Sequence, residues 1–204
     1  MIKNIISDIG NVLFKFDIVD FLYKHTDKVD DVNEFLDNTI RDKNWSLMDK
    51  GDLSFNDAKN YFLHACPKYK FILKQIFDSY LSDVLSMHHN IEILKEYKLK
   101  GYNIYYLSNM PVETFNVIRK KTDFFDKTCS GGIISADVKI IKPTKAIYEL
   151  LLKRYKLNIK ECLFIDDNLD NVTSAQKMGI KSIHLKNIDD LSLELKNIEY
   201  DENN

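Results

Sequence analysis

Short apolar runs along the chain end in polar side chains. These runs, with the polar residues that follow them, are 2–7 before Asp8, 103–107 before Ser108-Asn109, and 162–165 before Asp166-Asp167-Asn168. A short apolar run bounded by turn-forming residues is typical of a buried strand, and Gly10-Asn11 is such a turn signal. A further run at 182–185 follows Gly179. The pattern predicts strands that each place polar groups at their carboxyl ends.

Segments with helical periodicity separate these runs. They are Ile91, Leu94, Tyr97 and Leu99 before Gly101, then Val112 to Ile118 after Pro111, and Ile147, Leu150, Leu151 and Tyr155 after Pro143. Alternating strands and helices predict an α/β fold with a parallel sheet covered by helices on both faces. Ligands of such sheets bind outside the carboxyl ends of the strands. The polar clusters are therefore expected to meet there.

Residues 16–86 differ, because they show helical periodicity and contain no strand that ends in a polar cluster. The apolar positions are Ile18, Phe21 and Leu22, then Val32, Phe35 and Leu36, then the segments 54–65 and 69–85. Ser54 and Asp57 have the spacing of a helix capping box, and Gly51 breaks the chain just before them. We predict an α/β core domain at 1–15 and 87–204, and an all-helical domain at 16–86 inserted after the first strand.

Composition narrows the class of protein. The 204 residues are 45% apolar with a net charge of −2, and only 3 of the 29 basic residues are Arg, which argues against a nucleic-acid partner. The 3 Cys have no metal-ligand spacing, which favours free thiols in a reducing compartment. No apolar run approaches the length of a membrane span. We expect a cytoplasmic protein without nucleic-acid or membrane partners, either monomeric or homodimeric.

The polar clusters together resemble the four motifs of the haloacid dehalogenase superfamily. The matching stretches are Ser7-Asp8-Ile9-Gly10-Asn11-Val12-Leu13, Leu107-Ser108-Asn109, Lys142-Pro143, and Phe164-Ile165-Asp166-Asp167-Asn168 through Asn171-Val172. The likeness covers nearly the whole chain and implies a three-layer Rossmann-like core with a helical cap. The stretches 8–12 and 50–54 are most similar to small bacterial sugar-phosphate phosphatases and to the phosphatase domain of soluble epoxide hydrolase.

The resemblance implies roles for the residues that match. Asp8 would attack phosphorus and form an aspartyl-phosphate, which splits hydrolysis into two easier steps. Its metal partners would be Asp166, Asp167 and the Gly10 carbonyl, an oxygen set that suits Mg²⁺. Ser108 and Lys142 would assist catalysis. The phosphate and substrate would contact Ser108, Asn109, Lys142, Asn11 and Trp45. Lys142 would also hold Asp8 ionised.

Gly10 departs from the pattern of most phosphatases of this superfamily. They carry a second Asp at this position, which protonates the leaving group and then activates water. General acid-base catalysis contributes roughly 10²- to 10⁴-fold, so another group is needed if hydrolysis is to be fast. Asp17, water or a substrate hydroxyl are candidates, although a carboxylate at the hinge or helix start is the simpler interpretation of Asp17.

Other residues have a structural and a functional interpretation. Trp45, the single Trp, either packs in the cap or stacks on a sugar ring. His88-His89 precede a helix and are expected at its start or on the surface, because adjacent residues do not face each other on a helix. Asp189-Asp190 are expected in a solvated turn or at the start of a helix.

The leading hypothesis is a Mg²⁺-dependent phosphatase of a small phosphorylated metabolite, such as a hexose phosphate. The first alternative is a phosphometabolite-binding or regulatory protein that lost the proton donor. A metal-independent 2-haloacid dehalogenase also lacks an Asp at this position, but Asp166 and Asp167 beside Asp8 would repel it without a cation. A phosphomutase is disfavoured, because that reaction depends on the missing acid.

Overall fold

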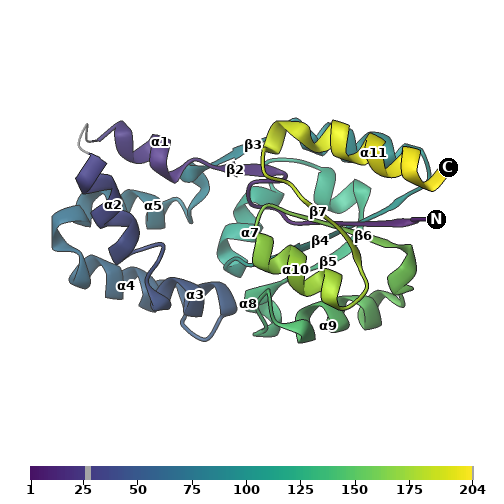
Figure 1. The fold of residues 1–204 in the computed structure, drawn as a ribbon. Helices are drawn as coiled ribbons and strands as arrows, with labels where there is room; N and C mark the ends of the chain where they lie inside the picture. The colour runs from purple at the N-terminus through teal and green to yellow at the C-terminus, as the bar shows by residue number, and fades with distance from the viewer. Residues whose placement is uncertain (26–28, 204) are drawn as a thin grey trace.

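A five-stranded parallel sheet forms the centre of the larger part of the molecule (Figure 1). The computed structural model describes residues 1–25 and 29–203. The strands are β1 (Asn4–Ser7), β4 (Asn103–Ser108), β5 (Cys129–Ile134), β6 (Cys162–Asp166) and β7 (Lys181–His184). Their order across the sheet is β5-β4-β1-β6-β7. The chain runs outward from β1 to one edge and then returns to β6 on its other side. This reversal places a ligand crevice at the carboxyl ends of β1 and β6.

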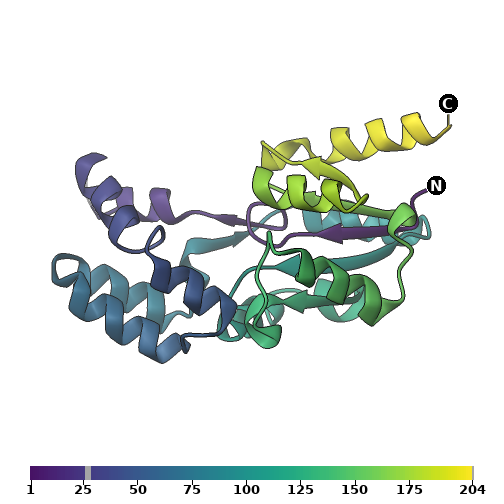
Figure 2. The ribbon, with the colours of Figure 1, turned by 60° about the horizontal axis from the view of Figure 1, so that its bottom comes forward.

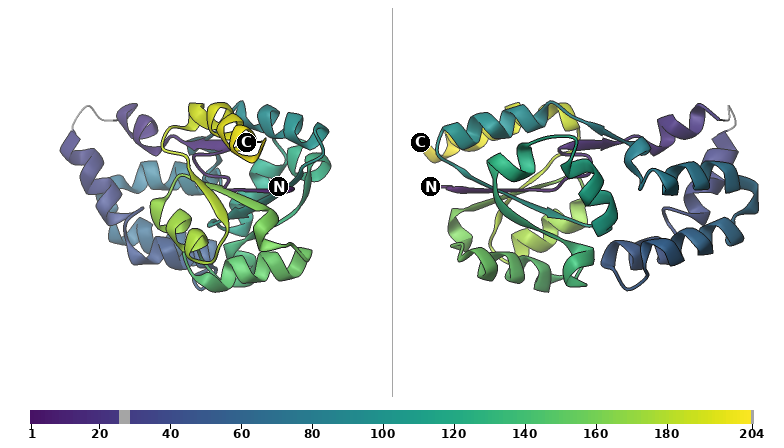
Figure 3. Two further views of the ribbon diagram at one scale, coloured as in Figure 1. Left: turned by 45° about the vertical axis from the view of Figure 1, so that its right-hand side comes forward. Right: turned by 180° about the vertical axis from the view of Figure 1, so that it is seen from behind.

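Helices cover both faces of the sheet (Figures 1 and 3). One face packs against α6 (Asn90–Leu99), α7 (Val112–Arg119) and α11 (Leu191–Asn203), and the other against α9 (Lys145–Tyr155) and α10 (Leu169–Lys177). Ile5 and Ile6 are both buried, but they belong to different hydrophobic cores, because successive strand residues point to opposite faces. The predicted three-layer α/β architecture is confirmed.

A helical cap lies beyond the carboxyl ends of the strands (Figure 2). It comprises α1 (Ile18–Tyr23), α2 (Val29–Asn38), α3 (Lys43–Lys50), α4 (Phe55–Ala65) and α5 (Lys70–Asp78). These helices have a hydrophobic core of their own, in which Phe35, Phe62 and Phe77 are buried. Ser54 caps α4 by accepting a hydrogen bond from the Asp57 backbone amide at 3.1 Å, which confirms the expected cap.

Two short strands join the cap to the core, and the sequence pattern did not predict them. β2 (Phe14–Phe16) pairs antiparallel with β3 (Leu85–Met87). The helical assignment of 69–85 was therefore wrong at its end: α5 stops at Asp78, and Tyr80 and Leu81 have positive φ values of 52° and 63° before the 3₁₀ turn η2 (Ser82–Val84). Strands of three residues are too short for a period of two to be recognised.

Strand β5 was also missed, because Gly131 and Gly132 interrupt its apolar pattern. A Cβ atom at Gly131 would lie 2.4 Å from Tyr155 Cε1, and one at Gly132 would lie 2.3 Å from two ring atoms of Tyr106. The two aromatic rings therefore pack directly on the strand backbone. Glycine is required here by tertiary packing, which weakens the local strand signal.

The end of α3 contacts the core at α8 (Ser135–Val138). Gly51 ends α3 with φ +80°, and a Cβ atom there would lie 2.5 Å from the Ala136 carbonyl oxygen. The Ser135 hydroxyl donates to the Asp49 carbonyl and accepts from the Met110 backbone amide at 3.0 Å. Close backbone approach and hydrogen bonding thus dock the cap on the core.

The docking predicts an unequal cost of alanine at two helix-ending glycines. Gly179 has φ +90° and open space around its Cβ position, whereas Gly51 has φ +80° and meets Ala136. Gly179→Ala is expected to lower the free energy of unfolding by about 1–2 kcal/mol through backbone strain. Gly51→Ala should lower it by at least about 1 kcal/mol more, measured by urea unfolding. Equal losses would show that α3 and α8 do not stay in contact in solution.

Candidate active site

Three carboxylates meet at the crevice between β1 and β6. Asp8 follows β1, with its backbone amide donating to the Ile165 carbonyl at 2.8 Å, and Asp166 ends β6. One carboxylate oxygen from each of Asp8, Asp166 and Asp167 lies within 4.8 Å of the others. Because parallel strands end at the same edge of the sheet, residues more than 150 positions apart lie side by side, as their sequence positions predicted.

Lys142 lies beneath this cluster and is almost completely buried. Its Nζ atom contacts Asp166 Oδ2 at 2.7 Å and Asp8 Oδ2 at 2.9 Å, and it donates to the Leu107 carbonyl at 2.9 Å. An ammonium group has three N–H donors, so all three are engaged by the protein. Lys142 thus balances the charge of Asp8 and Asp166, and its predicted contact with the phosphate stays a prediction.

The charged groups of the cluster shift one another's pKa values. Burial raises the pKa of Asp8 to about 7, against the lowering effect of Lys142 and with a further raise from Asp166 and Asp167. Burial likewise raises the pKa of Asp167. Burial disfavours the charged form of Lys142, but Asp8 and Asp166 raise its pKa overall. Lys142 therefore acts on the pKa of Asp8 in the expected direction, but burial and the two neighbouring carboxylates outweigh its effect.

The donor set fits a hard divalent cation. Carboxylate oxygens at this spacing are the ligands that Mg²⁺ prefers, and a cation would offset the repulsion that raises the pKa of Asp8 and Asp167. Two further residues hold Asp166 in place: Asn171 Nδ2 donates to its Oδ1 at 3.0 Å and Oδ2 at 3.1 Å, and the Asn168 amide donates to Oδ1 at 2.8 Å. Neither residue was assigned a role from the sequence.

Asn11, Ser108 and Asn109 all line the cavity above the cluster. The Asn11 side chain donates to Asp167 Oδ2 at 2.9 Å and accepts from the Phe16 amide at 3.0 Å. Ser108 lies beside Asp8 and lowers its pKa. Asn109 Nδ2 donates to the Lys142 carbonyl at 3.0 Å, and its Oδ1 accepts from the Lys142 amide at 2.9 Å. These side chains position the charged residues, as well as facing the cavity.

A cavity of about 300 Å³ lies between the core and the cap. Its polar wall contains Asp8, Gly10, Asn11, Ser108, Asn109, Thr114 and Asp167 from the core, and Asp49 from the cap. Its apolar wall contains Phe16, Ile40, Trp45, Leu81, Leu85, Met110 and Pro111. This volume suits a small-molecule site. Among the residues that the structure describes, no Lys or Arg lines this cavity.

Trp45 and Asp17 have different positions relative to this cavity. Trp45 lines it, and its ring packs against Phe62 and Phe77 at centroid distances of 5.9 and 6.1 Å. The packing in the cap is confirmed, and a contact of Trp45 with the substrate stays a prediction. Asp17 is absent from the described lining. It forms an ion pair with Lys15 at 2.8 Å and accepts from the Ser86 hydroxyl. Asp17 is therefore a hinge carboxylate beside β2 and β3.

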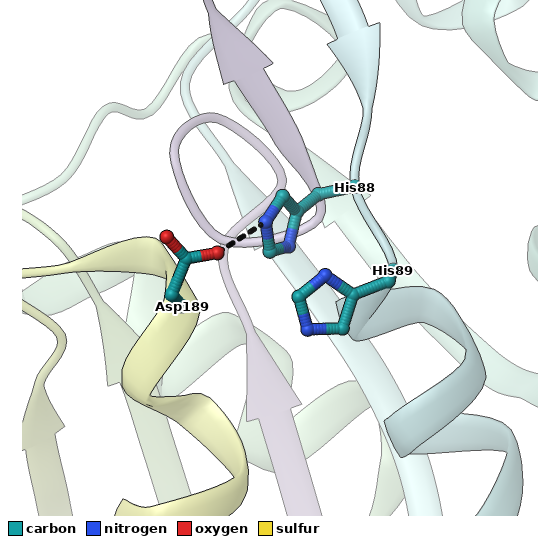
Figure 4. Close-up of side chains that lie close together, drawn as sticks. All are labelled: His88, His89 and Asp189. Carbon is teal, nitrogen blue, oxygen red and sulfur yellow. Dashed lines mark hydrogen bonds and ion pairs between the residues drawn. The ribbon is translucent and has the colours of Figure 1, made fainter.

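A second polar cluster lies at the start of α6 (Figure 4). His88 Nε2 is 3.1 Å from Asp189 Oδ1, and the His88 and His89 rings lie 4.2 Å apart. The two residues lie at the start of α6, as expected from the sequence. The three side chains could hold a metal, but His88 Nδ1 accepts from the Asn90 amide at 3.4 Å. The contact of His88 Nε2 with Asp189 is accounted for by a hydrogen bond.

The fold and the site define a hydrolase with a Rossmann-like core, an aspartate at the end of its first strand and an inserted cap. The sequence of residues 2–179 matches the family model of the haloacid dehalogenase-like hydrolases. The chain belongs to this family. Within the described residues, no helix is both long and apolar enough to cross a membrane.

Curated relatives include two fungal proteins. The chain is 26% identical over 207 residues to a drimenol cyclase of Aspergillus calidoustus. This match covers 97% of this chain and 37% of the relative. The chain is also 34% identical over 96 residues to a sesquiterpene phosphatase of Aspergillus oryzae. This second match covers 46% of this chain and 47% of that protein. The chain thus spans less than half the length of either relative.

Solved structures share the fold. A haloacid dehalogenase family enzyme from Bacteroides thetaiotaomicron has a TM-score of 0.71 at 19% identity, over 89% of this chain and 92% of its own. A magnesium complex of that enzyme has a TM-score of 0.70 at 20% identity, with the same coverage. The L-2-haloacid dehalogenase of Xanthobacter autotrophicus has a TM-score of 0.65 at 16% identity, over 89% and 76%.

Proposed function

We propose that this protein is a Mg²⁺-dependent phosphatase that hydrolyses phosphate monoesters through an aspartyl-phosphate on Asp8. The observation that carries the proposal is the packing of Asp166 and Asp167 around Asp8 above a single buried Lys142. A dehalogenase nucleophile attacks a carbon that bears halide and needs no cation. Two additional carboxylates beside it would only add repulsion, so this arrangement favours the phosphatase over the dehalogenase.

The residues of the chain divide the chemistry between them. Asp8 lines the cavity and is held by Lys142 through its Oδ2 atom, and its carboxylate attacks phosphorus. The Ser108 hydroxyl and the Asn109 backbone amide would donate to the phosphoryl oxygens, since both residues line the cavity. Asp8, Asp166, Asp167 and the Gly10 carbonyl would hold Mg²⁺, which neutralises charge on the transferring phosphoryl group. Lys142 holds the attacking carboxylate of Asp8 and the carboxylate of Asp166 in position by contacting both.

The apolar wall of the cavity bears on the choice of substrate. Trp45, Leu81 and Met110 are among seven apolar lining residues, and each buried methylene contributes about 0.8 kcal/mol. The Aspergillus oryzae relative is a sesquiterpene phosphatase. We therefore favour a monoester whose alcohol carries apolar surface over the hexose phosphate suggested by the sequence alone.

Chelation is expected to abolish turnover reversibly. With hexyl phosphate as substrate, EDTA should lower kcat/KM by at least about 100-fold, because the cation contributes several kcal/mol to stabilising charge in the transition state. Excess Mg²⁺ should restore the rate. The measurement is phosphate release with and without each addition, run in parallel with glucose 6-phosphate, for which a lower kcat/KM is expected.

Other outcomes would support the alternatives. Phosphate release that is insensitive to EDTA would contradict a metal-dependent mechanism. Chloride release from 2-chloropropionate would revive the dehalogenase. Tight binding of hexyl phosphate without turnover would favour the non-catalytic binding protein, in which the site remains but hydrolysis is lost.

A further inference from the structure

A carboxyl group of the cap lies in the active-site cavity without a protein partner. Asp49 is in the last turn of α3 and lines the cavity together with Asp8. Trp45, one helical turn earlier, lines the same cavity, so this face of α3 is directed at the site. Among residues 1–25 and 29–203, no group donates a hydrogen bond or forms an ion pair with the Asp49 carboxylate.

The surroundings of Asp49 contrast with those of other cap carboxylates. Asp42 accepts from the Asn44 amide at 2.7 Å, and Asp52 pairs with Lys50 at 2.6 Å. Burial raises the pKa of Asp49 well above its ordinary value, and the nearby charge of Asp8 raises it further. A carboxylate without a partner in such surroundings is unfavourable, which favours the neutral acid. In that form the group is a hydrogen-bond donor.

The backbone fixes Asp49 over the site. Its carbonyl accepts from the Ser135 hydroxyl of the core, and Gly51 packs against Ala136 two residues later. The carboxyl group is therefore carried by a docked helix end, and does not depend on a free loop. A catalytic acid needs such support, because proton transfer requires hydrogen-bond reach to the reacting oxygen.

The core offers no competing acid at this position. A Cβ atom at Gly10 would meet nothing within 4 Å, so the space beside the nucleophile is open. The other titratable groups in the described lining, Asp8 and Asp167, belong to the nucleophile and cation cluster. Asp49 is the one carboxyl group in that lining that is outside the cluster.

We propose that Asp49 is the general acid and base of this enzyme, supplied by the cap in place of a side chain at position 10. The role rests on the proposed phosphatase function. As Asp8 Oδ forms its bond to phosphorus, the bond from phosphorus to the leaving oxygen breaks, and that oxygen takes the proton of Asp49. The Asp49 carboxylate then accepts a proton from the water that attacks the aspartyl-phosphate. Phosphate leaves, Asp8 is free again, and Asp49 is again protonated.

The test compares two leaving groups in the Asp49→Asn variant. Hydrolysis of hexyl phosphate releases an alkoxide, a poor leaving group that needs a proton. Hydrolysis of p-nitrophenyl phosphate releases a stabilised phenolate, which does not. We expect kcat/KM to fall roughly 10²- to 10⁴-fold for hexyl phosphate and less than about tenfold for p-nitrophenyl phosphate. The fall in rate for hexyl phosphate at high pH, where the acid loses its proton, should disappear in the variant.

Controls separate this role from structural effects. Asp52→Asn, which removes a partly exposed carboxylate from the same segment, should leave both rates unchanged. Asp49→Glu should keep more of the hexyl phosphate activity than Asp49→Asn. The midpoint temperature of thermal unfolding of Asp49→Asn should equal or exceed that of the wild type. An equal loss for both substrates, or no loss, would overturn the role of Asp49. Failure of the wild type to hydrolyse either substrate would instead refute the phosphatase function.

Discussion

Asp8→Asn is expected to lower phosphatase kcat/KM by roughly 10⁴-fold or more while leaving the protein folded. Asn has the shape of Asp but cannot form the acyl phosphate, so the path through a covalent intermediate is closed. The loss should be similar for hexyl and p-nitrophenyl phosphate, because attack on phosphorus is common to both. Steady-state phosphate release, together with labelling of the wild type by substrate phosphate, measures the effect.

The same variant should be more stable at high pH in the absence of metal. The pKa of Asp8 is raised by burial from 3.8 to about 7 in the folded protein. The folded state therefore holds a proton that the unfolded state releases, and stability falls as pH rises through this window. The difference in free energy of unfolding should be small at pH 4 and favour Asp8→Asn at pH 8. Retained activity, or a difference of the opposite sign, would contradict the assignment.

Lys142→Met is expected to be the most destabilising single change in the core. Lys142 is 3% exposed and pairs with both Asp8 and Asp166. Its removal leaves two buried carboxylates without their cation, a change that costs about 3–5 kcal/mol. Activity should be lost as well, because the nucleophile loses the group that orients it. Urea unfolding in the presence of EDTA measures the stability difference without contribution from added metal.

A neighbouring lysine provides the control. Lys145 forms an exposed ion pair with Glu149 at 2.8 Å, so Lys145→Met should change the free energy of unfolding by less than about 0.5 kcal/mol. Adding Asp8→Asn to Lys142→Met removes one unpaired carboxylate and should recover part of the lost stability. If the double variant were less stable than Lys142→Met, repulsion between carboxylates would not explain the role of Lys142.

The candidate site was largely predictable because parallel strands bring their ends together. Asp8, Ser108 and Asp166 each follow or end an apolar run, and a parallel sheet collects such residues at one edge. The motifs also assigned the family that the match over residues 2–179 confirms. Periodicity also predicted a helical insert between the first strand and the rest of the core.

What escaped the sequence depends on contacts between distant elements. The glycines of β5 accommodate Tyr106 and Tyr155, and β2 and β3 are recognisable only as a pair. The ammonium group of Lys142 is bound by Asp8, Asp166 and the Leu107 carbonyl, which lie at the ends of three different strands, β1, β6 and β4. None of these features leaves a local pattern in the chain.

By itself, the sequence determined the α/β architecture, the family and the group of polar residues at the strand ends, because local periodicity and strand direction suffice for these. Only the tertiary structure decided what faces that group across the cavity. Asp17 is nearer to Asp8 in the sequence, yet it lies at the hinge, while Asp49 lines the cavity. The docking of α3 on α8 makes the difference, and docking depends on backbone fit at Gly51 and Ser135 rather than on any local pattern.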